Sequence, residues 1–400
     1  MWVKNALIFL VLLSSTGLAT NVEVFTSPEN SLGAVTNFLE GANSVKIASY
    51  TFTSPEIASS LIELRQKGSD IAILLEASPV GSFPGKDILC WLQNNNITIM
   101  LYNGSFRFMH AKYIIKDDIN GKEVLISTEN FGTSGFPADN YGNRGWGVVV
   151  KDNEIASQFN DVFDDDMLDS VPLLCESSDY TFKIEKIEYQ PVTYNDQEVY
   201  TIFAPDAVQD MLNLIETAQD SIYLEQFYIY SYWGNKKEGY RDNLLLQAVI
   251  DKARLGLDVK ILLDSYWYNI DKEDPTSNYN TVEYLNDLAE NEGLNMEARL
   301  ADLSNYEKIH TKGMIIDDSV FVSSINWNEN SPRNNREVGV VITGEAANYF
   351  KDAFMQAWNG ETKTGDGKTG LAVADDNPVI IGIVVIVIIV VIVLIFWRKH

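Results

Sequence analysis

The chain has 400 residues and a formal net charge of −26, because 56 acidic residues stand against 30 basic ones. This length predicts roughly two to three domain-sized units rather than one small core. An acidic body repels polyanions at long range, which argues against a tight or processive nucleic-acid binder but leaves cleavage of short nucleic acids open.

The two ends of the chain are predicted to direct it to a membrane. Residues 1–19 combine Lys4, a short apolar run and small residues ending at Ala19, which is typical of a cleaved secretory signal peptide. The apolar run is short for the alternative, an uncleaved anchor. Val379 to Trp397 is uninterrupted by polar residues and is followed by basic residues, which predicts a transmembrane helix with a cytoplasmic end. We therefore expect a single-pass type I membrane protein with its body outside the cytoplasm.

Between these ends, β-rich and helical stretches alternate. In chain order, the elements expected in the first half are strand 22–25, a helix to about 39, strand 45–52, helix 55–67, strand 70–76, helix 86–93, strand 97–102, a strand at the first histidine, strand 124–127 after a two-residue turn, strand 146–151 and helix 153–163. Such alternation predicts an α/β fold.

The pattern restarts after a join that contains an acidic cluster. Thr201 to Pro205 resembles Val24 to Pro28 at an offset of 177, and later matches have offsets of 188 and 200. This growth implies insertions at loops of the second half, which we place in the aromatic stretch 228–240 and in the stretch 266–280. A repeat this long indicates two fused, like domains rather than a solenoid. The predicted layout is a signal peptide at 1–19, a first domain at 20–175, a linker at 176–197, a second domain at 198–360, a flexible stalk at 361–377 and a transmembrane helix at 378–397.

Cys90 and Cys175 are the only cysteines in the chain. In an exported protein they could form one disulfide, but they could equally be two buried thiols. Their spacing is not that of a metal site, so the sequence leaves these two alternatives open.

One motif, H-x-K-x4-D, occurs in both halves. His110, Lys112 and Asp117 form the first copy, and the second copy lies 200 residues later. The second copy consists of His310, Lys312 and Asp317, and the copies are followed by Ser-Thr-Glu-Asn at 127–130 and Ser-Ser-Ile-Asn at 323–326. A single copy could be a buried histidine beside a surface lysine, but two copies that use both internal histidines argue against that reading.

These residue types suit phosphodiester chemistry. If two half-sites face each other, one imidazole attacks phosphorus and the other moves protons to and from oxygen. The lysines and the asparagines hold the non-bridging oxygens as charge develops. The sequence contains no Cys/His metal spacing, no P-loop and no Gly-x-Ser-x-Gly elbow.

The paired motifs with trailing Ser and Asn resemble the phospholipase D superfamily over about residues 22–358. The resemblance implies two tandem α/β/α sandwich domains related by pseudo-twofold symmetry, and a phosphohistidine mechanism without a metal or other cofactor. The phosphate-site residues that it implies are His110, Lys112, Thr128, Asn130, His310, Lys312, Ser324 and Asn326. Asp117 and Asp317 match the acid of the motif, for which a fixing role is expected.

The two halves differ in one carboxylate. Glu337 stands where the superfamily has a carboxylate that orients a motif histidine, and we expect it to partner His310. The matching residue in the first half is Gly145, so His110 must be oriented by Glu129 or by a residue of the other half. By superfamily habit the first histidine is the nucleophile and the second the general acid and base, although the reverse stays open.

The leading functional hypothesis is a membrane-tethered enzyme that hydrolyses or transfers phospholipid phosphodiesters. The alternatives are an exported nuclease of the same superfamily and an inactive binding or scaffold protein. The aromatic run Phe227 to Trp233 is expected either to line the substrate entrance or to pack in the core. The head group and the choice between water and alcohol stay open, and a site completed within one chain is compatible with a monomer.

Overall fold

A computed structural model describes residues 18–360 apart from 82, 176–177, 185–186, 236 and 238, together with 362–364 and 368–370. The described residues up to Trp358 form one compact unit. In the separate C-terminal unit, β18 (Thr362–Thr364) pairs antiparallel with β19 (Lys368–Gly370). In the ranges just given, no helix is long and apolar enough to cross a membrane. The predicted membrane span at 378–397 and residues 1–17 of the predicted signal peptide lie outside these ranges.

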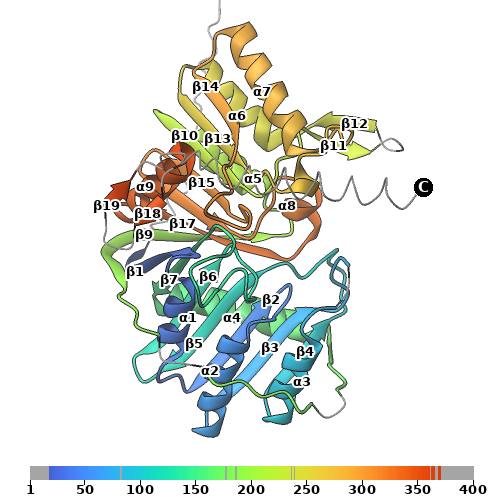
Figure 1. Ribbon diagram of the computed structural model, residues 1–400, viewed down its shortest axis with the longest axis vertical. Coiled ribbons are helices and arrows are strands. Elements are labelled where there is room, and N and C mark those ends of the chain that lie inside the picture. Colours follow the sequence, from blue (N-terminus) through green and yellow to red (C-terminus); the bar gives the residue numbers. More distant parts are fainter. Residues whose placement is uncertain are drawn as a thin grey trace, which may run out of the picture. The chain divides into compact units, whose positions relative to one another are not determined.

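The first half follows the expected α/β alternation (Figure 1). Its elements are β1 (Leu18–Ser27), α1 (Ser31–Leu39), β2 (Ser44–Ser49), α2 (Pro55–Gln66), β3 (Asp70–Glu76), α3 (Lys86–Asn94), β4 (Thr98–Tyr102), β5 (Lys112–Asp118), β6 (Gly121–Ser127), β7 (Gly145–Lys151), α4 (Asn153–Leu168) and β8 (Ser170–Pro172). Strand β1 begins inside the segment predicted as signal peptide, because Leu18 and Ala19 already pair with the second half.

The second half repeats this order with insertions. Its elements are β9 (Val192–Ala204), α5 (Val208–Glu216), β10 (Ser221–Gln226), β11 (Tyr232–Asn235), β12 (Gly239–Asp242), α6 (Leu244–Arg254), β13 (Asp258–Leu263), the 3-10 helix η1 (Trp267–Asn269), α7 (Asn278–Glu292), β14 (Met296–Leu300), β15 (Lys312–Ile316), β16 (Ser319–Ser323), α8 (Asn330–Asn334), β17 (Glu337–Thr343) and α9 (Ala346–Asn359). Strand β9 starts inside the predicted linker at 176–197, because its first residues pair with β1.

Some of the helices begin at a side chain that accepts hydrogen bonds from free backbone N–H groups. Ser54 caps α2 by accepting from the N–H of Ile57, with Pro55 at the first helical position. Asp152 caps α4 in the same way. In these helices the capping residue is a local signal that marks where the helix begins.

Fifteen of the described strands form one sheet, in the order β14-β13-β10-β15-β16-β17-β9-β1-β7-β6-β5-β2-β3-β4-β8. The order reads the same outward from the central β9–β1 pair: β17 and β7 come next, then β16 and β6, then β15 and β5. Strands β2, β3 and β4 run parallel, as do β10, β13 and β14, while the remaining pairs are antiparallel. This arrangement fits the expected pair of repeats.

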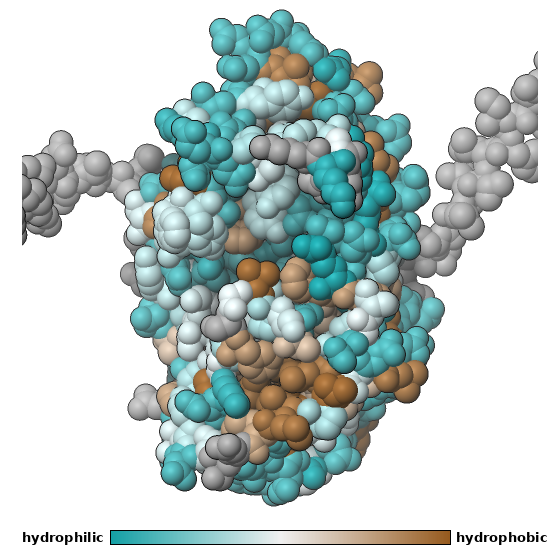
Figure 2. All heavy atoms as spheres, turned by 90° about the vertical axis from the view of Figure 1, so that its right-hand side faces the viewer, coloured by the Kyte–Doolittle hydropathy of each residue, from teal (hydrophilic) through white to brown (hydrophobic). Residues whose placement is uncertain are grey.

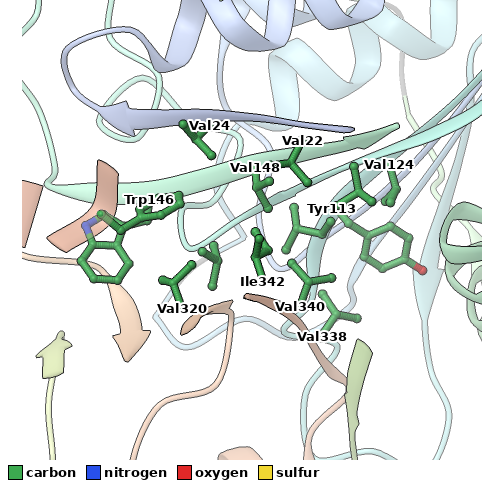
Figure 3. Packing of buried hydrophobic residues seen from close by; sticks show 14 of the residues in the cluster. Val22, Val24, Tyr113, Val124, Trp146, Val148, Val320, Val338, Val340 and Ile342 are labelled. Carbon is green, nitrogen blue, oxygen red and sulfur yellow. The ribbon is translucent and has the colours of Figure 1, made fainter. Parts of the chain in front are cut away.

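The helices and the sheet form layers around three apolar clusters. Helices α1, α2 and α3 cover one face of the first half, and α5, α6 and α7 cover the matching face of the second half. The inner faces pack against each other together with α4 and α9. Figure 3 shows Val22, Val148 and Tyr113 facing Val340 and Ile342 across this central core. The core therefore fixes one half against the other.

On one face of the molecule, the polarity of the surface differs between the halves. Figure 2 shows one face, on which hydrophilic side chains dominate over the second half while hydrophobic ones gather over the first half.

Cys90 of α3 and Cys175 form a disulfide across a sequence separation of 85 residues. Of the two alternatives that the sequence left open, a disulfide or two buried thiols, the structure has the disulfide. It ties the segment after β8 to the helical face, where Tyr180 also packs against Trp91.

Candidate active site

The two motif histidines lie at the junction of the halves. Each lies two residues before the first residue of a strand, β5 or β15, instead of lying within it as the extended pattern predicted. The N–H of His110 donates to the carbonyl of Arg336 at 2.9 Å, and the N–H of His310 donates to the carbonyl of Arg144 at 2.8 Å. Each motif is therefore held against a segment of the opposite half.

This crossing decides which carboxylate reaches which histidine. Nδ1 of His110 lies 2.8 Å from Oε2 of Glu337. Nδ1 of His310 lies 3.3 Å from Oε2 of Glu129, which is a longer contact. The predicted pairing of Glu337 with His310 is wrong, because Arg336, the neighbour of Glu337, is paired with the first half around Met109.

The two carboxylates come from different places in the repeat but are held by matching amides. Nδ2 of Asn143 donates to Glu129 at 2.9 Å, and Nδ2 of Asn335 donates to Glu337 at 2.9 Å. A Cβ at Gly145, the position that matches Glu337, would lie 2.6 Å from Cγ of Glu129. The absence of a side chain at Gly145 thus leaves the space that the Glu129 side chain occupies.

The motif lysines are buried beside the histidines. Nζ of Lys112 donates to the carbonyl of His110 at 2.6 Å, and Nζ of Lys312 donates to the carbonyl of His310 at 2.5 Å. Burial lowers the pKa of Lys112 to about 8. Burial and the Lys112 charge also hold the pKa of Lys312 well below its usual value. A bound phosphate anion would favour the charged form of both lysines.

Burial also shifts the histidines toward their neutral form. Burial, followed by the charge of Lys312, lowers the pKa of His310 to about 3. Burial lowers the pKa of His110 as well, although Glu337 opposes that shift. Burial alone would raise the pKa of Glu129 and of Glu337. The facing histidines and the lysines outweigh the effect of burial, so the pKa of each glutamate is lowered. With Nδ1 facing a carboxylate, Nε2 is the ring nitrogen left for chemistry.

The structure does not bring the motif acids into this site. Asp317 follows β15 at the end opposite Lys312, and its carboxylate accepts from the backbone N–H groups of Gln219, Asp220 and Ser221 at 2.8–2.9 Å. Asp117 lies at the corresponding end of β5, where its carbonyl accepts from Asn43. The contacts of the Asp317 carboxylate fit the expected fixing role, whereas the Asp117 contact is made by its backbone carbonyl. Neither residue lies beside the motif histidines, as a catalytic role would require.

The hydroxyls and amides that were expected to bind phosphate behave differently from each other. Oγ1 of Thr128 accepts from the N–H of Trp146, and Oγ of Ser324 accepts from the N–H of Val338, both at 3.0 Å. These hydroxyls therefore hold neighbouring strands together. Asn130 and Asn326 each have a buried Oδ1 without a partner in the described part of the chain. These two amide oxygens are acceptors, so they can pair with a hydrogen-bond donor but not with a phosphate oxygen.

Two further pairs of site residues were missed by the sequence reasoning. Glu76 accepts from the N–H of Met109 at 2.6 Å, and Asp264 accepts from the N–H of Ile309 at 2.8 Å, so a carboxylate fixes the residue before each histidine. The repeated Ile-Leu-Leu-acid at the ends of β3 and β13 was the available signal.

Aromatic rings form the second missed pair. The Tyr50 ring packs 4.9 Å from the His110 ring, and the Phe227 ring packs 4.8 Å from the His310 ring, measured between centroids. The two rings occupy matching positions at the offset of 177 seen in the repeat. They help to exclude water from the faces of both imidazoles.

A pocket of about 550 Å³ opens beside His110 and is lined by both halves. The first half contributes Tyr50 and Phe108, and the second half contributes much of the aromatic run between Tyr228 and Trp233. The run therefore lines an entrance to the site, which was one of its two expected roles.

Known proteins share this architecture. A family model described as cardiolipin synthase, PLD-like domain, matches residues 36–167 and 211–358. A phosphatidylserine synthase from Haemophilus influenzae Rd KW20 is 15% identical over 85% of this chain and 87% of that one, with a TM-score of 0.63. A polyphosphate kinase from Porphyromonas gingivalis is 12% identical over 89% of this chain and 52% of that one, with a TM-score of 0.53. A search of curated proteins finds no match.

At these identities the structural likenesses show the fold alone. The family match is broader evidence, because it covers most of both halves and includes both histidine motifs. The chain therefore belongs to the phospholipase D superfamily, in the family of the PLD-like domain of cardiolipin synthase.

Proposed function

We propose that the protein is a phosphodiesterase that hydrolyses or transfers the phosphatidyl group of phospholipids through a phosphohistidine. The observation that carries this proposal is the pair of histidines, His310 buried and His110 largely buried, each facing a carboxylate from the opposite half with a buried lysine beside it. The match to a cardiolipin synthase domain supports a phospholipid substrate.

The environments of the two histidines support a division of roles. His310 has a pKa of about 3 and is neutral, as a nucleophile must be. His110 has the shorter carboxylate contact, 2.8 Å to Glu337, which stabilises its protonated form, and it lines the pocket. We therefore assign His310 as nucleophile and His110 as general acid and base, the reverse of the assignment by superfamily habit.

In the proposed reaction, Nε2 of His310 attacks phosphorus while the bond from phosphorus to the alcohol oxygen breaks. The departing oxygen takes a proton from His110. His110 then removes a proton from water or a second alcohol, whose oxygen attacks phosphorus and releases His310. Lys112 and Lys312 hold the non-bridging oxygens throughout.

The test is to trap the covalent intermediate in the full-length protein in detergent, with a phospholipid substrate and a chelator present. We expect turnover in the wild type, an acid-labile phosphatidyl adduct on His310 that accumulates in His110→Asn, and no adduct in His310→Asn. An adduct on His110 would reverse the roles. Cleavage of single-stranded oligonucleotides with phospholipids untouched would establish the nuclease alternative instead.

We also propose that residues 378–397 hold this body at a membrane, outside the cytoplasm. The apolar sequence of that stretch supports the anchor. The disulfide between Cys90 and Cys175 supports an oxidising compartment. Protease protection of the intact chain in vesicles, compared with a chain ending at residue 377, tests both points.

A further inference from the structure

We propose that Arg144 and Arg336 are positioning residues, and that each one places the motif histidine of the opposite half. The proposal rests on the phosphodiesterase function proposed above. The two arginines occupy matching places in the repeat, because each directly follows the asparagine that holds a site carboxylate. Each Asn-Arg pair therefore serves one histidine: the asparagine holds the carboxylate that faces its imidazole, and the arginine holds its backbone.

The backbone of each arginine is bonded on both sides of the residue that precedes a histidine. The N–H of Arg144 donates to the carbonyl of Lys308 at 2.8 Å, and its carbonyl accepts from the N–H of His310 at 2.8 Å. The N–H of Arg336 donates at 2.9 Å to the carbonyl two residues before His110, and its own carbonyl accepts from that histidine at 2.9 Å. Each histidine therefore follows any shift of the arginine backbone, and a misplacement of about 1 Å is enough to slow a reaction strongly.

The guanidinium of Arg144 fixes this backbone in the core. Its Nε, Nη1 and Nη2 atoms donate to Glu225 at 3.3 Å, to Glu29 at 3.1 Å and to the carbonyl of Ala353 at 2.8 Å. The same group lies 5.4 Å from the centroid of the Tyr306 ring, and Arg144 is only 1% exposed. The ammonium of a lysine keeps the charge but cannot reproduce the planar fork that reaches these partners.

Arg336 is held in the same way by different partners. Its Nε and Nη2 atoms donate to Asp166 at 2.8 Å and 2.9 Å, and Nη1 donates to the carbonyl of Ala204 at 2.9 Å. Its guanidinium lies 4.3 Å from the centroid of the Phe106 ring. Phe106 and Tyr306 each stand four residues before a motif histidine. Each arginine therefore contacts both the start of a histidine segment and the histidine itself.

One further contact is present in the second half only. The hydroxyl of Thr311 donates to Oε1 of Glu225 at 2.7 Å and lies 3.1 Å from the carbonyl oxygen of Arg144. The matching residues of the first half are Ala111 and Ala48, which have no polar side-chain atom. Replacing Thr311 with alanine, the residue of the first half, therefore loosens the hold of Arg144 without altering the arginine.

The first experiment observes the histidines of the full-length protein by NMR of their imidazole nitrogens. The chain has three histidines, so the signals are few, and the histidine-to-asparagine variants assign them. We expect Arg144→Lys and Thr311→Ala to shift the signals of His310 and to leave those of His110 unchanged. Arg336→Lys should do the reverse. General loosening of the fold would not produce this crossed pattern.

The second experiment separates the two chemical steps with a phosphatidyl nitrophenyl ester. Its leaving group departs without a proton, so release of nitrophenolate in the first turnover depends on the nucleophile and hardly on the general acid. With His310 as nucleophile, Arg144→Lys should slow this release about tenfold or more. Arg336→Lys should change it less than about twofold and slow only the later transfer to water.

Arg299→Lys is the matched control. Arg299 also lies over a ring, that of Trp358 at 4.1 Å, and donates to the carbonyl of Trp358 at 3.2 Å. It belongs to β14 at the edge of the sheet, away from both motifs. This variant should shift neither histidine and should release nitrophenolate like the wild type.

A shift confined to the histidine of the arginine's own half, equal shifts of both histidines, or no shift in a folded variant would overturn the proposal. Release slowed by Arg336→Lys alone, with the adduct on His310, would do the same. The Arg336 side chain is 14% exposed, so Arg336→Lys tests the crossing by itself if Arg144→Lys does not fold. Crossed shifts in a protein that turns over no phosphodiester would instead count against the proposed function and leave the positioning in place.

Discussion

At the residue scale, the halves hold their histidines with carboxylates from different backbone positions. Glu337 opens β17, whereas Glu129 follows β6, and matching amides from Asn143 and Asn335 hold both. The second-half residue that matches Glu129 is Ile325. One carboxylate has thus changed its place in the chain while keeping its place in the site.

We predict that the carboxylate facing His310 can be supplied from position 145, the position that matches Glu337, instead of from position 129. Glu129→Ile should lower kcat/KM by about 10²-fold or more, because His310 loses the group that orients it. Gly145→Glu alone should destabilise the fold, since its Cβ would lie 2.6 Å from Cγ of Glu129. The double variant Glu129→Ile/Gly145→Glu should recover at least about tenfold of the lost kcat/KM.

The measurement is steady-state kinetics, with thermal unfolding of each variant as the control for folding. Glu129→Gln keeps the size of the side chain but not its charge, and it should be impaired while melting like the wild type. A double variant that folds but is no more active than Glu129→Ile would contradict the exchange.

The lysines predict a pH dependence of ligand binding. Lys112 has a pKa of about 8, so its ammonium is present below that pH and is lost above it. A methylphosphonate monoester keeps one negative charge and should bind about fivefold more weakly at pH 9 than at pH 8, following the fraction of ammonium. Calorimetry measures this, and Lys112→Met should flatten the dependence. Equal pH slopes in the wild type and Lys112→Met would refute it.

The histidines and lysines of the site could be predicted from the sequence, because their spacing is local and occurs twice. The partners of the histidines could not. His110 and Glu337 are 227 residues apart, and their contact depends on the crossing of backbone segments between the halves. A motif shows which residue types are present, but not which half of a two-domain site supplies the partner.

At the scale of elements, the disulfide ties the segment that joins the halves to the outer helices. Cys90 lies in α3, and the bond closes a loop across 85 residues. Gln93 also donates to the carbonyl of Leu173 at 2.8 Å, beside the same segment. The sequence could not choose between the disulfide and two free thiols, because cysteine spacing alone carries no distance.

Removing this bond should destabilise the protein without affecting catalysis. Cys90→Ser/Cys175→Ser should lower the free energy of unfolding by about 2–4 kcal/mol, because the unfolded chain gains the freedom that the loop denies it. Thermal unfolding with and without reductant measures the effect. The reductant should lower the Tm of the wild type only. If it shifts the variant equally, the bond is not the cause.

The growth of the repeat offset predicted where the insertions of the second half lie, but it did not predict their secondary structure. The aromatic stretch forms the hairpin of β11 and β12, and the stretch after β13 contains η1. Tyr and Trp occur in strands, loops and cores, so residue type did not distinguish these forms. Their consequence is functional, since β11 begins in the pocket wall at Tyr232.

At the scale of the whole molecule, the two repeats share one sheet and one site. Strands β1 and β9 pair antiparallel, and the inner faces of both halves meet in one core. Two tandem domains could be predicted from the repeat. Their fusion into a single sheet could not be predicted. It depends on β1, at the start of the first half, which pairs both with β7, near the end of that half, and with β9, the first strand of the second half.

This fusion predicts that neither half works alone. Residues 20–191 retain His110 but lack Glu337, and residues 192–358 retain His310 but lack Glu129. As a monomer, each half also exposes an inner apolar face and the edge of β1 or β9, which favours association. We therefore expect each monomeric half to have at least about 10²-fold lower activity, and co-expressed halves to regain it.

Activity measured together with the mass of the particle decides the matter. In a dimer of the first half, His110 of one copy would take the place of His310 against Glu129 of the other copy. Activity of such a dimer would therefore still depend on a carboxylate supplied from the opposite side of the site. A monomeric half as active as the intact chain would show that the opposite carboxylate is not needed. Activity that appears only when both halves are present establishes that the duplicated chain carries one indivisible site.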